Sequence, residues 1–397
     1  MNIDRFNWGT VRFGDLVKQA TSTGKGRTGD RVVGLEHLDS DALAVRRSAP
    51  EKTDHAFTRR FRAGQVLYGK RRVYQRKAGR VGFDGVCSND IIVMESASEA
   101  LHADLLPIII QTQSFVEHAL ATSVGSLSPR TNWKSIADFC FNLPTIEDQV
   151  RIADLVWASE EVAVRAQAAV DAAWAVEKRA LEDAYKSSTW PIVRLDSVGE
   201  VQLGRMQHRK YQTGRFSRPY VRVANVQDDH LDLAEVFEMD FDDKHYPKFA
   251  LMPGDVLTVE GNGSLEEIGR SAMWSGEIDE CCFQKALLRF RPGPGVVPEF
   301  AYGWLRRKYY RGDLAKMATR TTTLANITAV RFAAMDFPLP GLEVQNEVVR
   351  RVAEAREARR ALEEHARASR RLVRGLIDRI FSEDVPSDDL QRSQQRP

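Results

Sequence analysis

Apolar residues recur at alternating intervals of four and three along two long stretches of the chain. In the later stretch ten such positions run from Val348 to Ile380, and the positions 196 residues earlier run from Ile152 to Ala184. Eight of the ten positions are apolar in each set. A repeat of this kind is typical of coiled-coil helices. We therefore predict two uninterrupted helices of some 40 residues, ending near Tyr185 and Phe381.

We expect the two helices to pack on each other. The first carries many alanines where the second carries Leu, Val and Ile, and small side chains facing large ones permit close interdigitation. The short linker Ser187–Pro191 favours an antiparallel arrangement. Two amphipathic helices that dock separately, each on its own domain, are the alternative. The residues expected at the helix–helix interface are Ile152, Val156, Val170, Val348, Val352, Leu362, Val373 and Leu376.

About 140 residues of a different pattern precede each predicted helix. They are short β-branched and aromatic runs with Gly-rich turns and a few helical segments, which indicates an α+β fold. Several stretches occur twice and in the same order: WGTVRFGDLV and WPIVRLDSVG, FRAGQVLYGK and LMPGDVLTVE, and FNLPTIEDQVRIA and FPLPGLEVQNEVV. An ordered repeat of about 190 residues indicates a tandem duplication.

The duplication divides the chain into two heads and two spacer helices. We expect a first head at 1–143, a first helix at 144–189, a second head at 190–339, a second helix at 340–383 and a disordered tail at 384–397. Forty helical residues span about 60 Å. Because one turn of duplex DNA is about 34–36 Å, heads on such a spacer would suit two half-sites about one turn or slightly more apart.

Composition narrows the class of protein. The chain has no run of about twenty apolar residues and no apolar signal core, so we expect a cytoplasmic protein without a membrane span. Its four cysteines show no C-x-x-C spacing and are expected to be reduced thiols. Net charge is only +2, but residues 1–144 hold 20 Lys and Arg against 15 Asp and Glu. A basic first head is compatible with an anionic partner.

Motifs for chemistry are absent. The chain has no G-x-x-x-x-G-K-[ST], H-E-x-x-H or G-x-S-x-G, and no Asn/Asp-Pro-Pro-aromatic tetrapeptide of amino-methyltransferases. Asp255 and Glu260 in PGDVLTVEG could be a nuclease carboxylate pair, but the corresponding stretch AGQVLYGK has no such pair. The eight histidines have unrelated spacings. We therefore predict no catalytic residue and no metal site.

Two basic stretches are candidates for DNA contact. KRRVYQRKAGR in the first copy has six basic residues, no acid and one tyrosine, a pattern typical of phosphate contact, with a solvated surface as the alternative. RMQHRKYQTGRFSR in the second copy is also acid-free and contains glutamines, which can read adenine as Arg and Lys read guanine. The candidates are Lys70, Arg71, Arg72, Tyr74, Arg76, Lys77 and Arg80 in the first copy, and Gln207, Arg209, Lys210 and Arg215 in the second.

A third stretch of interest is EGNGSLEEIGR, from Glu260 to Arg270. Its glycines would let the backbone approach a ligand closely, although a simple hairpin turn explains them equally well. Asn262 in this stretch and Gln284 further on complete the set of candidate DNA-contacting residues.

Over nearly its whole length the chain resembles the DNA-specificity subunit of type I restriction–modification systems. The resemblance depends on the head-plus-helix duplication, on the F-x-L-P-x-[IL]-E-x-Q junctions at Phe141 and Phe337, and on motifs within the heads. KRRVYQRK with FDGVCSNDIIV is similar to one type of target-recognition domain, and EGNGSLEEIGRSAMW with Cys282 and Gln284 is similar to another. Gln284-Lys285-Ala286 stands where the family often has Gln-Asn-His.

This resemblance implies two similar α/β target-recognition domains separated by two long helices packed as an antiparallel coiled coil. Each head would read one half of an asymmetric, bipartite site in double-stranded DNA. The helices would set the spacing and dock two methyltransferase subunits, and a restriction/translocase subunit would complete the complex. The chain itself would hold no cofactor: S-adenosylmethionine would belong to the methyltransferase subunits, and ATP and Mg²⁺ to the restriction subunit.

Two other classes of function stay open at this point. The acidic first helix and the near-neutral second head also suit a non-catalytic, two-headed scaffold that joins proteins without binding DNA. A catalytic chain, either a nuclease or a methyltransferase, is the third class, and the missing motifs speak against it.

Overall fold

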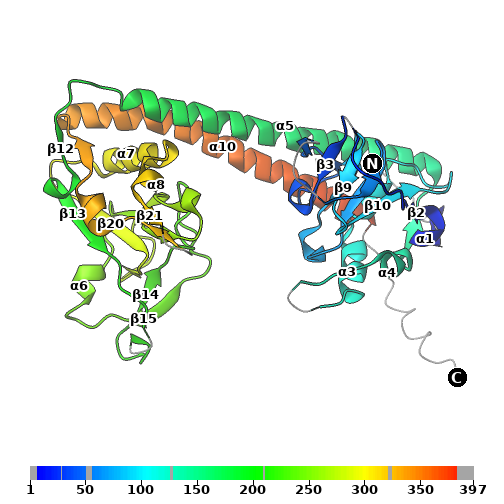
Figure 1. Ribbon diagram of the computed structural model, residues 1–397, viewed down its shortest axis with the longest axis horizontal. Coiled ribbons are helices and arrows are strands. Elements are labelled where there is room, and N and C mark those ends of the chain that lie inside the picture. The colour runs from blue at the N-terminus through cyan, green and yellow to red at the C-terminus, as the bar shows by residue number, and fades with distance from the viewer. Residues whose placement is uncertain are drawn as a thin grey trace. The chain divides into compact units, whose positions relative to one another are not determined.

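The computed structural model describes residues 7–27, 29–50, 56–125, 128–208, 211–320 and 324–381. The chain forms two compact units, Met1–Ala168 with Glu363–Pro397, and Ala169–Leu362. Each unit contains one head and a part of each long helix (Figure 1). The tail predicted at 384–397 lies outside the described residues.

The first head is built on two sheets. One has the order β2-β10-β7-β8-β4, and the other has the order β5-β3-β9-β6. Their strands are β2 (Val17–Gln19), β3 (Arg31–Val33), β4 (Ala44–Val45), β5 (Ala49–Pro50), β6 (Arg59–Phe61), β7 (Val66–Gly69), β8 (Ala78–Val81), β9 (Gly85–Cys87) and β10 (Ile91–Ser96). The helices of this head are α1 (Phe13–Leu16), α2 (Leu106–Ile109), α3 (Gln113–Ala121) and α4 (Trp133–Ala137). A separate pair, β1 (Gly9–Arg12) and β11 (Cys140–Leu143), joins the start of the head to its end.

The second head repeats this plan. Its sheets have the orders β13-β20-β16-β18 and β15-β14-β19, and a small third sheet has the order β17-β22-β21. The strands are β13 (Gly199–Leu203), β14 (Ser217–Val221), β15 (Phe237–Asp240), β16 (Val256–Val259), β17 (Gly261–Asn262), β18 (Ser271–Met273), β19 (Cys282–Phe283), β20 (Leu287–Pro292), β21 (Thr319–Arg320) and β22 (Ala325–Asn326). β12 (Ile192–Arg194) pairs with β23 (Asp336–Pro338) as β1 pairs with β11. The helices are α6 (Tyr246–Phe249), α7 (Pro298–Tyr310), α8 (Asp313–Met317) and α9 (Ala329–Ala333).

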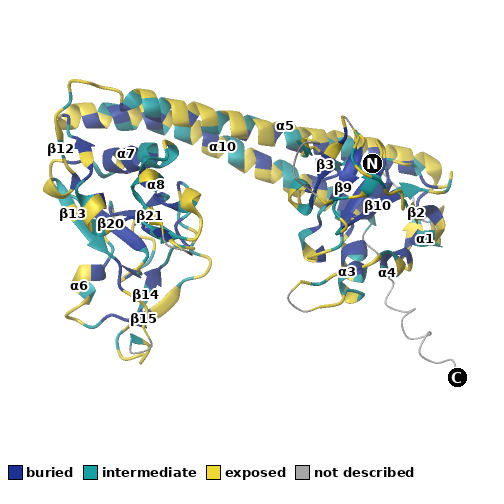
Figure 2. Ribbon diagram, viewed as in Figure 1, coloured by how far each residue is buried: buried dark blue, intermediate teal, exposed yellow. Residues whose placement is uncertain are grey.

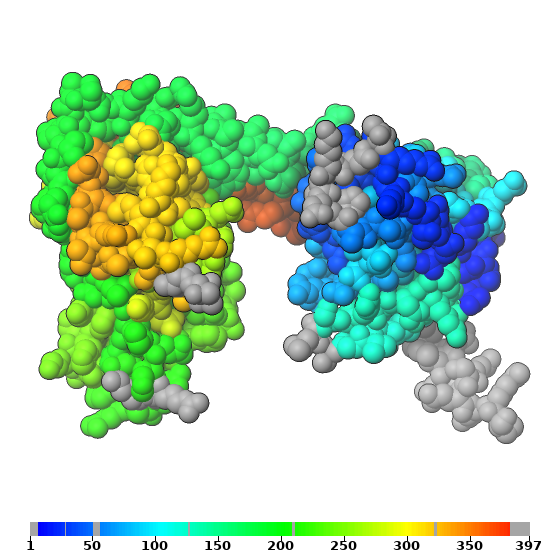
Figure 3. Space-filling view, in the orientation of Figure 1, coloured from blue at the N-terminus to red at the C-terminus, as the bar shows by residue number. Residues whose placement is uncertain are grey.

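Strand register shows that the two heads share one topology. Gly69 of β7 pairs with Ile91 of β10, and Val259 of β16 pairs with Leu287 of β20. The parallel pair β3–β9 likewise corresponds to β14–β19. Each head's visible surface is drawn in the colours of its own copy, blue to teal for the first and green to orange for the second (Figure 3). The duplication predicted from the sequence is therefore confirmed in strand order and in register.

The predicted long helices are α5 (Ile146–Ala184) and α10 (Leu342–Phe381). All twenty heptad positions are buried or half-buried, and exposed residues lie between them, as the alternating colours along both helices show (Figure 2). In the first unit the start of α5 shares a core with the end of α10, and in the second unit the end of α5 shares a core with the start of α10. The two helices therefore pack antiparallel, as predicted. The buried or half-buried positions include Ile152, Val156, Val170, Val348, Val352, Leu362, Val373 and Leu376.

The repeated junction has a specific structural role. The buried Gln149 side chain donates to the carbonyls of Ala100 and Pro144 at 2.8 and 2.9 Å, and accepts from the His102 amide at 2.8 Å. Gln345 makes the matching three bonds, to Gly295 and Pro340 at 3.0 and 2.8 Å and from Val297 at 2.8 Å. Backbone groups buried at each head–helix junction are thereby satisfied. This explains why the chain contains the same glutamine-bearing sequence twice.

Candidate nucleic-acid interface

The basic loop of the first head connects β7 to β8. Within it the short 3₁₀ turn η3 (Val73–Gln75) is flanked by Arg72 and Arg76, both with left-handed backbone conformations (φ 52° and 49°). Val73 is buried and anchors the turn, so Tyr74 between it and Gln75 faces solvent with 53% of its surface exposed. Arg71 and Arg72 are exposed beside it. The turn therefore presents two guanidinium groups and one aromatic ring together.

Further positive charge lies behind this turn. Arg71 and Arg130 both pair with the single carboxylate of Asp90, Arg71 Nε at 2.9 Å from Oδ2. Burial, together with the nearby positive charges of Arg59 and Arg130, lowers the pKa of the Lys70 amine. Two arginines thus pair with one acid, and the charges of Lys70 and Arg59 lie close by. A site with such an excess favours an anion such as a DNA phosphate.

Three of the predicted contact residues are held within the head instead. Arg76 is only 7% exposed, and its guanidinium donates to the Gln111 carbonyl at 3.0 Å and to the Gln113 side chain. Lys77 Nζ donates to the Leu35 carbonyl at 3.0 Å, and Arg80 pairs with Asp104. Their positive charges fasten the loop to the head. Of the DNA-contacting residues predicted in this loop, Arg71, Arg72 and Tyr74 are therefore the exposed ones, and Lys70 is half-buried.

In the second head the candidate residues lie on the loop after β13. Gln207 accepts a hydrogen bond from Gln284 at 3.2 Å, so two predicted contact residues that are far apart in sequence lie side by side. A Cβ on Gly204 would lie 2.3 Å from the carbonyl carbon of Gln284, so only glycine permits this close approach. Arg209 and Lys210 lie outside the described residues.

Two residues that the sequence interpretation did not select position this loop. Arg205 is buried and stacks on the ring of Tyr211, with its guanidinium carbon 3.9 Å from the ring centroid. Asp240 accepts bonds from the Thr213 amide, the Thr213 hydroxyl and the Phe216 amide at 2.8, 2.5 and 3.0 Å. The bond from the Thr213 side chain has the largest effect in lowering the pKa of Asp240. The predicted Arg215 is exposed on the turn that Asp240 holds.

The Gly-rich stretch after Glu260 connects β16 to β18, which pair antiparallel. It therefore connects an antiparallel strand pair, which agrees with the alternative that its glycines belong to a hairpin turn. Gly261 and Asn262 also pair with β22. The predicted Asn262 is half-buried, and its side chain accepts from the Ser264 amide at 3.0 Å.

The structure contradicts a nuclease carboxylate pair. Asp255 and Glu260 flank β16 at its opposite ends, which places them more than about 13 Å apart at ~3.3 Å per strand residue. Asp255 is also bound on both oxygens by Arg291 at 2.7 Å. Among the described residues no group of three or more His, Cys, Asp or Glu side chains could hold a metal ion. In the same residues, no helix has both the length and the apolar character needed to traverse a lipid bilayer.

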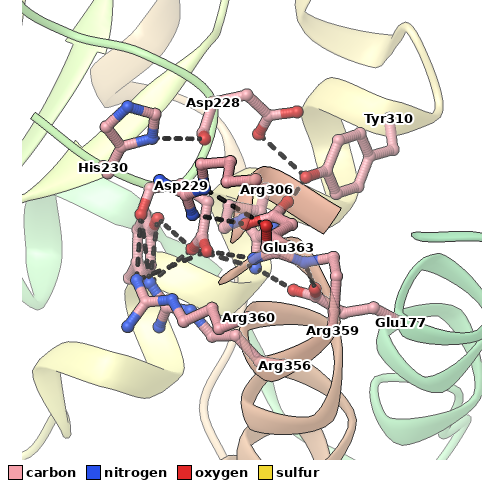
Figure 4. Close-up of polar contacts among 12 residues, drawn as sticks. Glu177, Asp228, Asp229, His230, Arg306, Tyr310, Arg356, Arg359, Arg360 and Glu363 are labelled. Atoms are coloured by element: carbon pink, nitrogen blue, oxygen red, sulfur yellow. Dashed lines mark hydrogen bonds and ion pairs between the residues drawn. The ribbon is translucent and has the colours of Figure 1, made fainter. Parts of the chain in front are cut away.

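A buried charge cluster in the second unit is the largest feature that sequence reasoning missed (Figure 4). The Asp229 carboxylate, 4% exposed, is contacted by Arg306, Arg356, Arg359 and Arg360, and the Tyr302 hydroxyl donates to it at 3.0 Å. Burial raises the pKa of Asp229, but the surrounding arginines outweigh it and lower the pKa overall. Glu177 accepts from Arg306 and from Arg359, each at 2.5 Å.

This cluster fastens the second head to the helices. Asp229 lies in the connection between β14 and β15, Arg306 on α7, Glu177 on α5 and Arg359 on α10. One indication was present in the sequence: Glu177 and Arg359 are the two charged residues among the twenty heptad positions. A charged residue at such a position often fixes which partner and register a helix selects.

Comparisons with solved structures give the fold a context. A chain from a study of complex assembly and conformational transition of the type I R-M system aligns with a TM-score of 0.58 and 20% identity, covering 95% of this chain and 98% of that one. The S subunit of a type I restriction–modification system from M. genitalium aligns with a TM-score of 0.52 and 9% identity, covering 96% and 98%. The HsdS subunit from Thermoanaerobacter tengcongensis aligns over 97% and 99% with 18% identity and a TM-score of 0.40.

No protein-family model matches the sequence, and a search of curated proteins finds no match. The likeness to the first two structures covers nearly the whole chain in each direction. The protein therefore has the fold of type I specificity subunits, in which two similar α/β heads are joined through two long helices.

Proposed function

We propose that this protein is the DNA-specificity subunit of a type I restriction–modification complex. The observation that carries the proposal is that two heads of one topology present different side chains on their candidate DNA-contacting loops. The first presents Arg71, Arg72 and Tyr74, and the second presents the Gln207–Gln284 pair. Heads that present different donors and acceptors read different bases. Each head thus recognises one half of an asymmetric, bipartite DNA site.

The partners follow from the same proposal. A solved structure with this fold comes from work on assembly of a type I complex, which supports a role among partner subunits. The helices α5 and α10 set the spacing of the half-sites and dock two methyltransferase subunits, and a restriction/translocase subunit joins them in the cytoplasm. This chain performs no bond chemistry. S-adenosylmethionine is bound by the methyltransferase subunits, and ATP and Mg²⁺ by the restriction subunit.

Binding to DNA across a salt series tests this proposal. The full chain, alone and with its methyltransferase subunits, is titrated with random duplex DNA and with genomic fragments. The logarithm of the association constant is expected to fall linearly with the logarithm of salt concentration, because phosphate contacts release counterions. Adding the methyltransferase subunits should leave this dependence in place and add a preference for particular fragments. A protein-joining scaffold would show no binding to DNA at any salt concentration.

A further inference from the structure

Lys70 and Glu260 occupy the same position in the two heads. Each is the first residue after the corresponding strand, β7 or β16. The Lys70 amide donates to the Asp90 carbonyl at 2.8 Å, and the Glu260 amide donates to the Ala286 carbonyl at 2.9 Å. Because β10 and β20 begin immediately after Asp90 and Ala286, these two acceptors correspond as well.

A second pair of bonds fixes the other side of the same residues. The Lys70 carbonyl accepts from the Thr131 amide at 3.0 Å, and the Glu260 carbonyl accepts from the Ile327 amide at 2.9 Å. Thr131 and Ile327 each precede the N-cap residue of a corresponding helix, α4 or α9. The backbone of this position is therefore held by the same two hydrogen bonds in both heads. The side chain is a cation in one head and a carboxylate in the other.

Both residues lie next to candidate DNA contacts along the backbone. In the first head Arg71 follows Lys70 directly, and its backbone forms an isolated antiparallel β-bridge with that of Arg130. In the second head Asn262 is two residues beyond Glu260, and the Ala286 carbonyl that holds the Glu260 amide is two residues beyond Gln284. The position is thus at the strand end around which the predicted contact loops gather. It also lies at the end of a strand in each head, and strands position a base-contacting side chain more precisely than loops do.

The Glu260 carboxylate has a single, distant donor among the described residues. Glu260 is 4% exposed, yet within the part of the chain that the structure describes its side chain has one donor, Asn326 Nδ2, at the long distance of 3.5 Å. No Lys or Arg of that part pairs with it. Burial raises the pKa of Glu260, partly offset by the positive charge of Lys285. By contrast Asp255 and Asp240, in the same head, each accept three or more bonds.

Lys70 lacks acceptors in the same way. Its ammonium group makes no hydrogen bond or ion pair to another described residue. The positive charges of Arg59 and Arg130 lie nearby, and the negative charge of Asp90 offsets them only in part. A buried carboxylate with one distant donor, and an ammonium group that has no acceptor and lies near other cations, are both unfavourable unless a ligand supplies the missing hydrogen bonds. Base edges in the major groove supply the complementary groups: exocyclic amines donate, and guanine O6 and N7 accept.

On the basis of the proposed function, we propose that this strand-end position is a base-reading position in both heads. Glu260 accepts a hydrogen bond from an exocyclic amine, the cytosine N4 or adenine N6 group, in the half-site of the second head. Lys70 donates to the O6 and N7 atoms of a guanine in the half-site of the first head. The opposite charges at one position contribute to the difference between the two half-sites.

Selection from a randomised duplex library tests the proposal, with the full chain assembled with its methyltransferase subunits. Glu260→Ala is expected to reduce discrimination about 10- to 100-fold at one base pair of one half-site, and Lys70→Gln at one guanine of the other. The Glu260→Gln variant shows whether Glu260 contacts the cytosine N4 or the adenine N6 amine. A cytosine preference should be lost in favour of adenine, whereas an adenine preference should persist, since glutamine pairs with adenine N6 and N7.

Glu266→Gln is the matched control, because this carboxylate is exposed in the same connection and is expected to leave the motif unchanged. If both Glu260 variants select the wild-type motif, the assignment of Glu260 is wrong although the proposed function stands. If wild-type protein selects no bipartite motif, the proposed function itself fails. Uniform loss of binding with a lowered melting temperature in Glu260→Gln would show a structural role and also overturn the assignment.

Discussion

Glu177 Oε2 on α5 accepts a hydrogen bond from Arg359 Nε on α10 at 2.5 Å, and both residues are fully buried. They are the charged members of an otherwise apolar or small heptad pattern. Around them Arg306 and Asp229 bring α7 and the β14–β15 connection to the same point. The second head is therefore fixed to the helices by charge as well as by apolar packing. Charges buried in this way stabilise a fold only while all of them remain paired.

Removing Glu177 should be strongly destabilising. Glu177→Ala leaves Arg306 and Arg359 without one of their carboxylates, and breaking a buried pair of this kind costs about 3–5 kcal/mol. Native-state hydrogen exchange of α7 amides measures this loss locally. Asp183→Ala is the control, because its partner Arg179 is on the same helix and both side chains are largely exposed. That variant should change stability by no more than about 0.5 kcal/mol. Equal effects of the two would refute a structural role for the cluster.

Gln149→Ala and Gln345→Ala should each destabilise one unit only. Each change leaves buried backbone groups at a junction without partners, at a cost of about 1–3 kcal/mol per group. Hydrogen exchange should report the first loss in the first unit and the second loss in the second unit. Because the two sites share no partner, their effects in the double variant should add within about 0.5 kcal/mol. A strong departure from additivity would contradict the independence of the two junctions.

Neutralising the exposed arginines of the first head should weaken DNA binding at all sequences. The double change Arg71→Gln and Arg72→Gln should lower the slope of log affinity against log salt concentration by about 1.8, since each phosphate contact contributes about 0.9. Arg76→Gln is the matched control from the same loop. Because Arg76 is buried against Gln111, its replacement should lower the melting temperature and leave the salt slope unchanged. An unaltered slope in the double variant would remove the basic loop from the interface.

Stability should depend on pH in opposite directions at Glu260 and Asp240. Burial raises the pKa of Glu260 in the folded protein, so its unfavourable contribution appears as pH rises above its unfolded pKa of about 4.3 and is complete above the folded value. Glu260→Gln should therefore be as stable as wild type near pH 4 and more stable at pH 7. Urea unfolding at both pH values measures the difference. Greater stability of the wild type at pH 7 would mean that the carboxylate is well satisfied in the free protein.

Asp240→Asn provides the opposite case. Hydrogen bonds, above all the one from Thr213, lower the pKa of Asp240 in the folded protein, so its contribution is present above its unfolded pKa of about 3.9 and is lost as pH falls through the folded value. This variant should be less stable than wild type at pH 7, and the difference should shrink in acid.

Much of the fold could be predicted because it depends on periodic or repeated residues. The heptads around Val156 and Val352 specify two long helices and their common face, and the glutamine of each junction marks where a helix starts. Side-chain positions within loops could not be predicted in this way. Arg72 and Arg76 are chemically alike in sequence, and only a left-handed turn around the buried Val73 exposes one and buries the other.

The equivalence of Lys70 and Glu260 is implied by the repeat, because FRAGQVLYGK and LMPGDVLTVE end on these two residues. The backbone hydrogen bonds confirm this equivalence and add that the two residues are held by matching contacts, which the sequence could not show. The role of Asp229 in the buried charge cluster could not be predicted from the sequence. Asp229 is one of many acidic residues in the second head, and its partners come from two elements distant in the chain, α7 and α10. Long-range polar contacts of this kind leave no periodic pattern.

Mapping methylated adenines across the genome, in cells with and without this gene, tests the proposed function most directly. If the protein is a type I specificity subunit, deletion removes methylation from one asymmetric motif made of two short specified halves and an unspecified gap. An unchanged methylation map, or loss of a single continuous motif, would contradict the proposal that two heads of this chain read two half-sites.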